Sequence, residues 1–412
     1  MKTIKKLLSL LGPGFVTGAA DDDPSGIATY AQTGAQFGFS QLWTSLFSFP
    51  LMTCIQEMCG RIGMITNKGL IQVIKSFYTK KLLYLTVSLL FIANTFNIGA
   101  DLGAMAEALQ LIVPVPFYLS LIAIAVGSLL LEVFIPYAIY ARYLKYLTLA
   151  LFSYIATLFF IRIEWGEVIY ATFVPHLAFT KDYLMNITAI LGTTISPYLF
   201  FWQANQEVEE RQQHNITQIS QDHINNLRID TVLGMLFSNL IMWFIITATG
   251  ATLFKNGIHH ITSGGEAALA LKPFAGDFSC FIFAIGILGT GLLAIPILAG
   301  SVAYAVAEMM SWPCSLALTY GNGKKFYHVI AITIIIGALI NFLPINSITL
   351  LYYSAVLNGL IAPILIFIIL SIANNQTIMG KHVNGPLAKS LGLFTGIIMS
   401  IVALSLAIAW VY

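Results

Sequence analysis

Long apolar segments alternate with short polar ones along the whole chain. Stretches of about 20 apolar residues, each ended by proline, glycine or charge, predict helices long enough to cross a membrane. Eleven such helices are expected, near residues 10–36, 40–64, 82–112, 117–138, 144–162, 184–208, 228–254, 276–310, 327–343, 347–373 and 390–411. The pattern predicts an all-α integral membrane protein in which residues 1–412 form a single transmembrane domain.

The composition supports a membrane protein and excludes several other classes. Of the 412 residues, 58% are hydrophobic and only 9% are charged, whereas soluble domains have about 25% charged residues. The net charge of +2 argues against a nucleic-acid partner, which would require a basic surface. Cys54, Cys59, Cys280 and Cys314 lie in apolar surroundings without metal-type spacing, which is typical of small core side chains.

The basic residues predict how the helices are oriented. With the N-terminus in the cytoplasm, 16 of the 20 Lys and Arg residues fall in cytoplasmic segments, and only Arg162, Lys181, Lys255 and Lys272 fall on the other side. Cytoplasmic loops are enriched in these residues. The basic start of the chain resembles a signal peptide, but it continues into a polar turn and further helix, so we expect a retained first span. With eleven spans, the C-terminus then lies on the outer side of the membrane. We expect this membrane to be the cell membrane, and specifically a prokaryotic inner membrane.

Three consecutive acids interrupt the first predicted span. Asp21, Asp22 and Asp23 are followed by Pro24, and ionisable residues inside a bilayer are costly and usually mark an ion or substrate path. A simpler interpretation makes Asp23 a helix N-cap with Pro24 at the first helical position. That interpretation does not explain three acids in a row. We expect Asp22 to line the entry or hold a metal-bound water, and Asp21 to lie on the outer side of the turn, satisfied by helix N–H groups.

A second break occurs at the matching position five spans later, at Ser196 and Pro197. Proline removes a backbone donor and disfavours helix in the residue before it. Two matching breaks predict inverted repeats, near 10–162 and 184–373, with an extra helix near 390–411 and a binding site at the membrane midplane. Two ordinary proline kinks are the alternative.

The residue types at the breaks predict a cation as ligand. Unwound carbonyls, the Asp23 carboxylate and the hydroxyls of Thr193, Thr194 and Ser196 supply only oxygen, and neither break contains Cys, His or Met. Oxygen ligands suit Mg²⁺, Mn²⁺ or Ca²⁺, whereas softer metals prefer sulfur or imidazole.

Three motifs resemble those of the NRAMP divalent-metal transporters, in an order and spacing that extends over most of the chain. They are Gly12-Pro13-Gly14-Phe15 with Asp23-Pro24-Ser25-Gly26, then Asn97-Ile98-Gly99-Ala100-Asp101, and then the segment from Ile190 to Tyr198. The resemblance implies a LeuT-type inverted repeat of five-helix halves with helices 1 and 6 broken. It also implies a secondary transporter that is not an enzyme and needs no cofactor, with a divalent metal ion and the lipid bilayer as its partners; protein partners are not indicated.

The chain departs from the family pattern at four positions. Gly26 stands where the family has an asparagine ligand, Ser196 where it has a methionine ligand, Tyr198 where it has a histidine, and Ala104 where it has a second acid. These losses resemble the NRAMP-related magnesium transporters, a divergent branch associated with Mg²⁺ and Mn²⁺. They imply a wider oxygen-lined site for a partly hydrated ion, because Mg²⁺ keeps several waters.

The resulting prediction is Mg²⁺ import, also of Mn²⁺, not coupled to protons. Direct contact is expected from Asp23 and the Thr193 carbonyl, with Asp22, Gly26 and Ser196 completing the metal site. The expected pathway residues are Ser25, Tyr198, Asp101 and Asn358. Alternatives are a proton-coupled Mn²⁺/Fe²⁺ symporter and, less favoured because of the acids, a sodium-coupled amino-acid transporter. No motif supports a membrane enzyme or receptor.

Other acids have open roles at this point. Glu57 and Arg61 have the spacing of a helical ion pair, and Glu107 is expected to pair near a helix end. Glu132 has no local partner in the sequence. The acids Glu207, Glu209 and Glu210 either form a cation exit or end a solvated helix.

Overall fold

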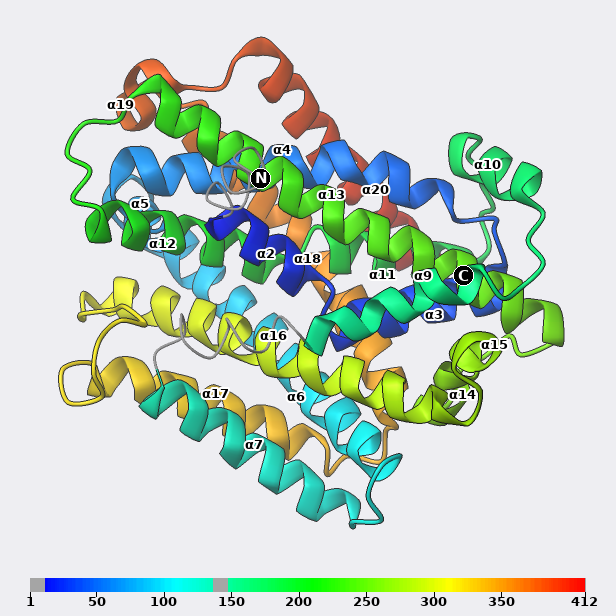
Figure 1. Cartoon of the computed structure of the whole chain (residues 1–412). Helices are drawn as coiled ribbons and strands as arrows, with labels where there is room; N and C mark the ends of the chain where they lie inside the picture. The colour runs from blue at the N-terminus through cyan, green and yellow to red at the C-terminus, as the bar shows by residue number, and fades with distance from the viewer. Residues whose placement is uncertain (1–11, 136–146, 412) are drawn as a thin grey trace, which may run out of the picture.

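The computed structural model describes residues 12–135 and 147–411, and all of these that take regular structure are helical (Figure 1). The basic start, residues 1–11, and parts of two predicted spans, 117–138 and 144–162, lie outside the described residues. The expected all-α fold is confirmed.

Both predicted breaks are present. Helix α2 (Pro13–Asp21) ends at the acids and α3 (Pro24–Phe37) begins directly after Asp23. Likewise α11 (Lys181–Thr194) ends before Ser196, and α12 (Pro197–Gln213) follows. Each new half-helix starts with proline at its first position, where a missing N–H costs nothing. Each pair therefore forms one interrupted helix, in which several backbone groups at the break have no intrahelical hydrogen-bond partner.

The remaining elements connect and surround these two pairs. They are α4 (Trp43–Thr66), α5 (Leu70–Phe77), α6 (Lys80–Gln110), α7 (Phe117–Phe134), α9 (Phe152–Leu158), α10 (Trp165–Phe173), α13 (Gln221–Thr252), α14 (Gly264–Ala268), α15 (Lys272–Ala275), α16 (Ser279–Met310), α17 (Lys324–Ile340), α18 (Ser347–Ala373), α19 (Gln376–Met379) and α20 (Pro386–Val411). Short 3₁₀ turns lie at Leu147–Leu151, Phe254–Asn256, Leu269–Leu271, Gly276–Phe278 and Gly380–His382.

Seven helical stretches of the described part are long and apolar enough to cross a membrane. They are Lys80–Gln110, Phe117–Phe134, Lys181–Gln213, Gln221–Asn256, Gly264–Met310, Ser347–Ala373 and Pro386–Ala409. Each of the eleven predicted stretches contains helix, but the other four are interrupted, less apolar, shorter or only partly described. The count of eleven therefore stays a prediction.

The broken helices lie at the centre of the bundle. α2 and α3 pack against α13, α11 packs against α18, and α12 packs against α4 and α16 (Figure 1). Glycines allow the closest approach: a Cβ built on Gly18 of α2 would lie 2.2 Å from the backbone of Gly234 in α13. The beginning of α2 marks one face of the bundle, here named the α2 face. The end of α3 marks the opposite face, here named the α3 face.

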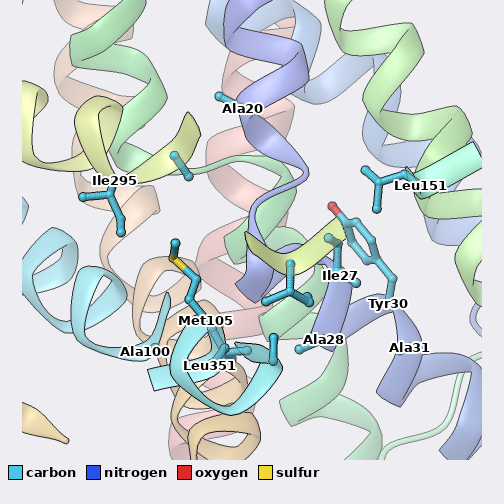
Figure 2. Close-up of a cluster of buried hydrophobic side chains, with 14 of the residues drawn as sticks. Ala20, Ile27, Ala28, Tyr30, Ala31, Ala100, Met105, Leu151, Ile295 and Leu351 are labelled. Atoms are coloured by element: carbon cyan, nitrogen blue, oxygen red, sulfur yellow. The ribbon is translucent and has the colours of Figure 1, made fainter. Parts of the chain in front are cut away.

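An apolar cluster surrounds the first break (Figure 2). Figure 2 shows Ala20 and Ile27 on either side of the turn between α2 and α3, and Met105 of α6 below it. All three side chains are at most 1% exposed. Polar groups at the break are therefore enclosed by packed hydrophobic side chains, which strengthens every electrostatic interaction there.

Candidate metal site

Asp23 is both the N-cap of α3 and the centre of a hydrogen-bonded site. Its Oδ1 accepts bonds from the Gly26 N–H and the Ser25 hydroxyl, both at 2.7 Å. Its Oδ2 accepts from Asn97 Nδ2 of α6 at 2.9 Å and from the Tyr198 hydroxyl of α12 at 3.3 Å. The carboxylate is 1% exposed. The N-cap interpretation is thus confirmed, and the same carboxylate joins three helices.

The other two acids of the turn face a different helix. The Ser238 hydroxyl of α13 lies 2.5 Å from Asp21 Oδ2 and 3.3 Å from Asp22 Oδ1. Both carboxylates are at most 1% exposed. The prediction that Asp21 is satisfied by helix N–H groups on the outer side is wrong, because the close packing of α2 on α13 buries it. Asp22 makes no hydrogen bond with any group that binds Asp23.

Thr193 and Gly26, from the two interrupted helices, lie close to each other. A Cβ added to Gly26 would lie 3.1 Å from Thr193 Oγ1 and 3.1 Å from the Asp21 carbonyl oxygen. Ser196 turns back onto its own helix, where its hydroxyl lies 2.9 Å from the Gly192 carbonyl and 2.5 Å from the Thr193 carbonyl. The Thr193 carbonyl therefore already accepts one bond and keeps one lone pair for an ion.

Two of the predicted pathway residues carry buried polar atoms without hydrogen bonds. Asp101 lies one turn after Asn97 in α6, close to the Ser25 backbone, but neither carboxylate oxygen makes a hydrogen bond of regular geometry. Asn358 of α18 is 1% exposed and both of its amide atoms lack a partner among the described residues. The structure joins Ser25 and Tyr198 to Asp23 directly and leaves Asn358 without a bond to this group.

Two contributors to the turn were missed by sequence reasoning. Asn97 belongs to the same motif as Asp101 and lies one helical turn before it, so its place on the same side of the helix was predictable from the sequence. Its Oδ1 is buried and unpartnered beside Asp23. Ser238 is a single hydroxyl in an apolar helix, and only the packing of α13 on α2 identifies it.

Most of the remaining acids have structural partners. Glu57 pairs with Arg61 at 3.0 Å, as predicted, and with Arg228 at 2.9 Å. Glu107 accepts a bond from the Ser347 N–H at 3.3 Å. Glu209 accepts one from the Leu316 N–H at 3.1 Å.

Pockets approach the centre from both faces. A pocket of about 130 Å³ on the α2 face is lined by Glu207, Glu210 and Asp230, among others. A pocket of about 250 Å³ on the α3 face includes Gln32 and Asp182. Within residues 12–135 and 147–411, no three His, Cys, Asp or Glu side chains converge to hold a metal by themselves. A cation at the centre therefore depends on carbonyl, hydroxyl or amide oxygens as well.

Comparison with known proteins identifies the family. The model of the family described as Nramp, natural resistance-associated macrophage protein-like, matches residues 14–409. The divalent metal cation transporter MntH of Caldanaerobacter subterraneus subsp. tengcongensis is 26% identical over 397 residues, covering 95% of this chain and 90% of that protein. Metal transporter Nramp6 of Arabidopsis thaliana is 25% identical over 305 residues, covering 70% of this chain and 56% of that protein.

Solved structures show the same fold. The manganese transporter of Eremococcus coleocola superimposes with a TM-score of 0.80 at 18% identity, covering 98% of this chain and 86% of that one. The inward-facing structure of Mhp1 gives a TM-score of 0.55 at 12% identity, covering 97% and 91%. Together with the two interrupted helices, these likenesses support the expected LeuT-like fold. The metal ion is then a substrate, not a cofactor, and no enzymatic activity is implied. This chain belongs to the Nramp family and is a multi-pass divalent metal cation transporter.

Proposed function

We propose that the transported ion is preferentially Mg²⁺, with Mn²⁺ also accepted, and that it binds at Asp23. The observation that carries the proposal is that the side chains and unwound carbonyls near this carboxylate can offer oxygen atoms to an ion. Ser25, Tyr198 and Thr193 offer hydroxyls, the break in α11–α12 offers carbonyls, and neither break contains Cys, His or Met in its sequence. Hard oxygen ligands are those that Mg²⁺ and Mn²⁺ take in proteins.

Asn97 changes the ligand argument in one respect. The family amide is absent at Gly26, but Asn97 places an amide beside Asp23 from α6, with its Oδ1 free of hydrogen bonds. An amide oxygen is also a hard ligand, so its presence supports the same class of ion. The site differs from the family pattern chiefly in lacking the thioether, and this loss removes the preference for softer metals.

Binding requires one of the Asp23 hydrogen bonds to open. The carboxylate already accepts four bonds, and two oxygens offer about four lone-pair sites. The Tyr198 hydroxyl makes the longest bond, 3.3 Å, and also lies 3.2 Å from the Ala20 carbonyl. Tyr198 is therefore the donor that yields most readily, by turning fully toward Ala20 when the ion arrives.

We further propose that transport is uncoupled from protons and runs inward from the α3 face. Tyr198 and Ala104 replace the histidine and the second acid that the family resemblance links with proton movement. A membrane potential of 100 mV supplies about 2.3 kcal/mol per charge, or about 4.6 kcal/mol for a divalent ion, so entry needs no second driving ion. The Lys and Arg distribution supports a cytoplasmic α2 face in a prokaryotic cell and a C-terminus outside.

A proton-coupled Mn²⁺/Fe²⁺ symporter is the second candidate. The observation that favours it is Asp101, a buried carboxylate beside the site without a hydrogen-bonding partner. Such a group is suited to carry a proton.

Uptake into proteoliposomes with an internal pH dye separates the two candidates. We expect Mg²⁺ and Mn²⁺ uptake without internal acidification under an inside-negative potential. Asp23→Asn should abolish it, whereas Asp277→Asn, at an exposed position remote from the turn, should not. Absence of Mg²⁺ flux together with proton-linked Mn²⁺ flux would establish the symporter instead. Ca²⁺ and Na⁺ serve as selectivity controls.

A further inference from the structure

The three acids of the turn divide between two sides. Asp23 points to α6 and α12, where Asn97 and Tyr198 bind it. Asp21 and Asp22 point to α13, where they share the Ser238 hydroxyl. A single ion at Asp23 therefore leaves the carboxylates of Asp21 and Asp22 without a cation.

Unpartnered oxygens collect on the α13 side. Asp21 Oδ1 and Asp22 Oδ2 are buried and accept no hydrogen bond from any described residue. The Tyr30 hydroxyl is an independent sign of a missing ligand: the side chain is 0% exposed, and its hydroxyl points toward the turn between α2 and α3 (Figure 2). It lies near Thr193 and the three acids but makes no hydrogen bond of regular geometry.

The acids around the turn, when ionised, carry more charge than one divalent ion balances. Asp101 adds a fourth buried carboxyl group to Asp21, Asp22 and Asp23. The two ion pairs identified among the described residues both involve Glu57 and none of these four acids. Burying unpaired charge is strongly unfavourable. Each of these acids is neutralised either by a proton or by a cation, and two divalent cations match the charge of all four in their ionised form.

We propose that Asp21, Asp22, Ser238 and Tyr30 form a second position for a hard divalent cation, beside the Asp23 position and separate from it. Two carboxylates and two hydroxyls give it an all-oxygen ligand set. Paired metal positions linked by neighbouring carboxylates are known to hold ions about 4 Å apart. Repulsion between the two ions then lowers the affinity of each, which lets a bound ion leave a buried site. This inference rests on the geometry of the turn and does not require Mg²⁺ selectivity.

Mn²⁺ alone is the probe, because its unbound form is counted directly by electron paramagnetic resonance. Purified full-length protein in detergent is titrated with Mn²⁺, and the number of ions bound per chain is measured. We expect two for the unmodified chain, one for Asp21→Asn and one for Asp23→Asn. The doubly loaded chain should also show dipolar broadening between the two ions. One ion per chain in the unmodified protein, or two in Asp21→Asn, overturns the proposal.

Milder variants keep the test valid if Asp21→Asn does not fold. Ser238→Ala and Tyr30→Phe should weaken one of the two positions by about 10-fold and leave the other unchanged, since lost supporting groups cost 10–100-fold in metal affinity. Ser128→Ala and Tyr154→Phe are matched controls, because these hydroxyls are also buried but lie on α7 and α9. If the controls and the site variants behave alike, the second position is absent.

The outcomes distinguish this inference from the proposed function. Two bound Mn²⁺ ions in a protein that does not transport Mg²⁺ would sustain the second position and overturn the Mg²⁺ preference. Proton-independent Mg²⁺ uptake by a protein that binds one ion would support the proposed function and overturn the second position.

Discussion

The contact between Gly18 of α2 and Gly234 of α13 holds the first half-helix against the bundle, and adding one methyl group tests what that contact does. A Cβ on Gly18 would lie 2.2 Å from the carbonyl carbon and oxygen of Gly234 and 2.6 Å from its Cα. These atoms are backbone, so no side chain can turn away to make room. We therefore expect Gly18→Ala to drive α2 away from α13.

The size of the effect follows from the distance. Restoring an ordinary contact of 3.4 Å from 2.2 Å requires the two backbones to separate by about 1.2 Å. Forcing an extra methyl group into a packed interior costs about 1–3 kcal/mol. A change of this size shifts a two-state equilibrium by about 5- to 150-fold. The state in which α2 lies against α13 should be depopulated by that factor, with the rest of the bundle folded.

Two measurements test this expectation. Hydrogen exchange of the α2 amides should accelerate, and ion uptake into proteoliposomes should fall by about 10-fold or more. Gly127→Ala in α7 is the matched control, because a Cβ there meets nothing within 4 Å. Replacing glycine by alanine inside a helix is otherwise favourable by about 1 kcal/mol, so the control should be neutral or slightly stabilised. Uptake and exchange in Gly18→Ala equal to those of the control would refute the reasoning.

Three further predictions concern the selectivity of the site, the anchoring of α2 and a loop thiol. Gly26→Asn combined with Ser196→Met should lower Mg²⁺ uptake relative to Mn²⁺, because the space at residue 26 closes within 3.1 Å; an unchanged ratio would count against the oxygen-ligand argument. Asp230→Ala removes the acceptor for the N–H groups of Gly12, Gly14 and Phe15 at the start of α2. It should weaken the packing of α2 against α13 by about 1–2 kcal/mol and speed the hydrogen exchange of the α2 amides. Unaltered exchange would contradict this role of Asp230. Burial raises the pKa of the Cys314 thiol to about 12. The rate of its labelling by maleimide, followed by mass spectrometry, should therefore keep rising about tenfold per pH unit through pH 10, because only the thiolate reacts. A rate that levels off near pH 9 would contradict this raised pKa.

The breaks and their order in the chain were predictable from the sequence because proline and consecutive acids constrain the backbone locally. Pro24 and Pro197 begin the second half-helices as expected, and Asp23 is the N-cap. The Glu57–Arg61 pair was also predictable, since both residues lie on one helix with i, i+4 spacing. Each of these features depends on a few neighbouring residues.

The side to which each acid points was not predictable, because it depends on contacts between helices far apart in the chain. The sequence pattern groups Asp22 with Asp23 as a metal ligand. In the structure Asp22 instead shares with Asp21 the hydroxyl of Ser238, which lies more than 200 positions further along the chain. The close approach of Gly18 to Gly234 brings α2 against α13, the helix that carries Ser238. A single glycine in an apolar helix carries no sign of the helix that it will contact, so only the folded arrangement identifies the partner.

The pockets on the α3 face lead to a last prediction about which step limits transport. The pocket of about 250 Å³ shares Ala28 of α3, Ile261 and Ile348 of α18 with a narrow apolar pocket of about 10 Å³, which has room for about one water. Mg²⁺ gives up its waters reluctantly, and this narrow pocket has room for about one water, so a partly hydrated ion passes only if α3 and α18 separate. A conformational step common to both ions should then limit the rate, and Mg²⁺ and Mn²⁺ should show similar maximal uptake rates at saturating concentration. A maximal rate for Mg²⁺ that is lower by orders of magnitude would instead make removal of its waters the limiting step. It would mean that the helices stay together while the ion passes.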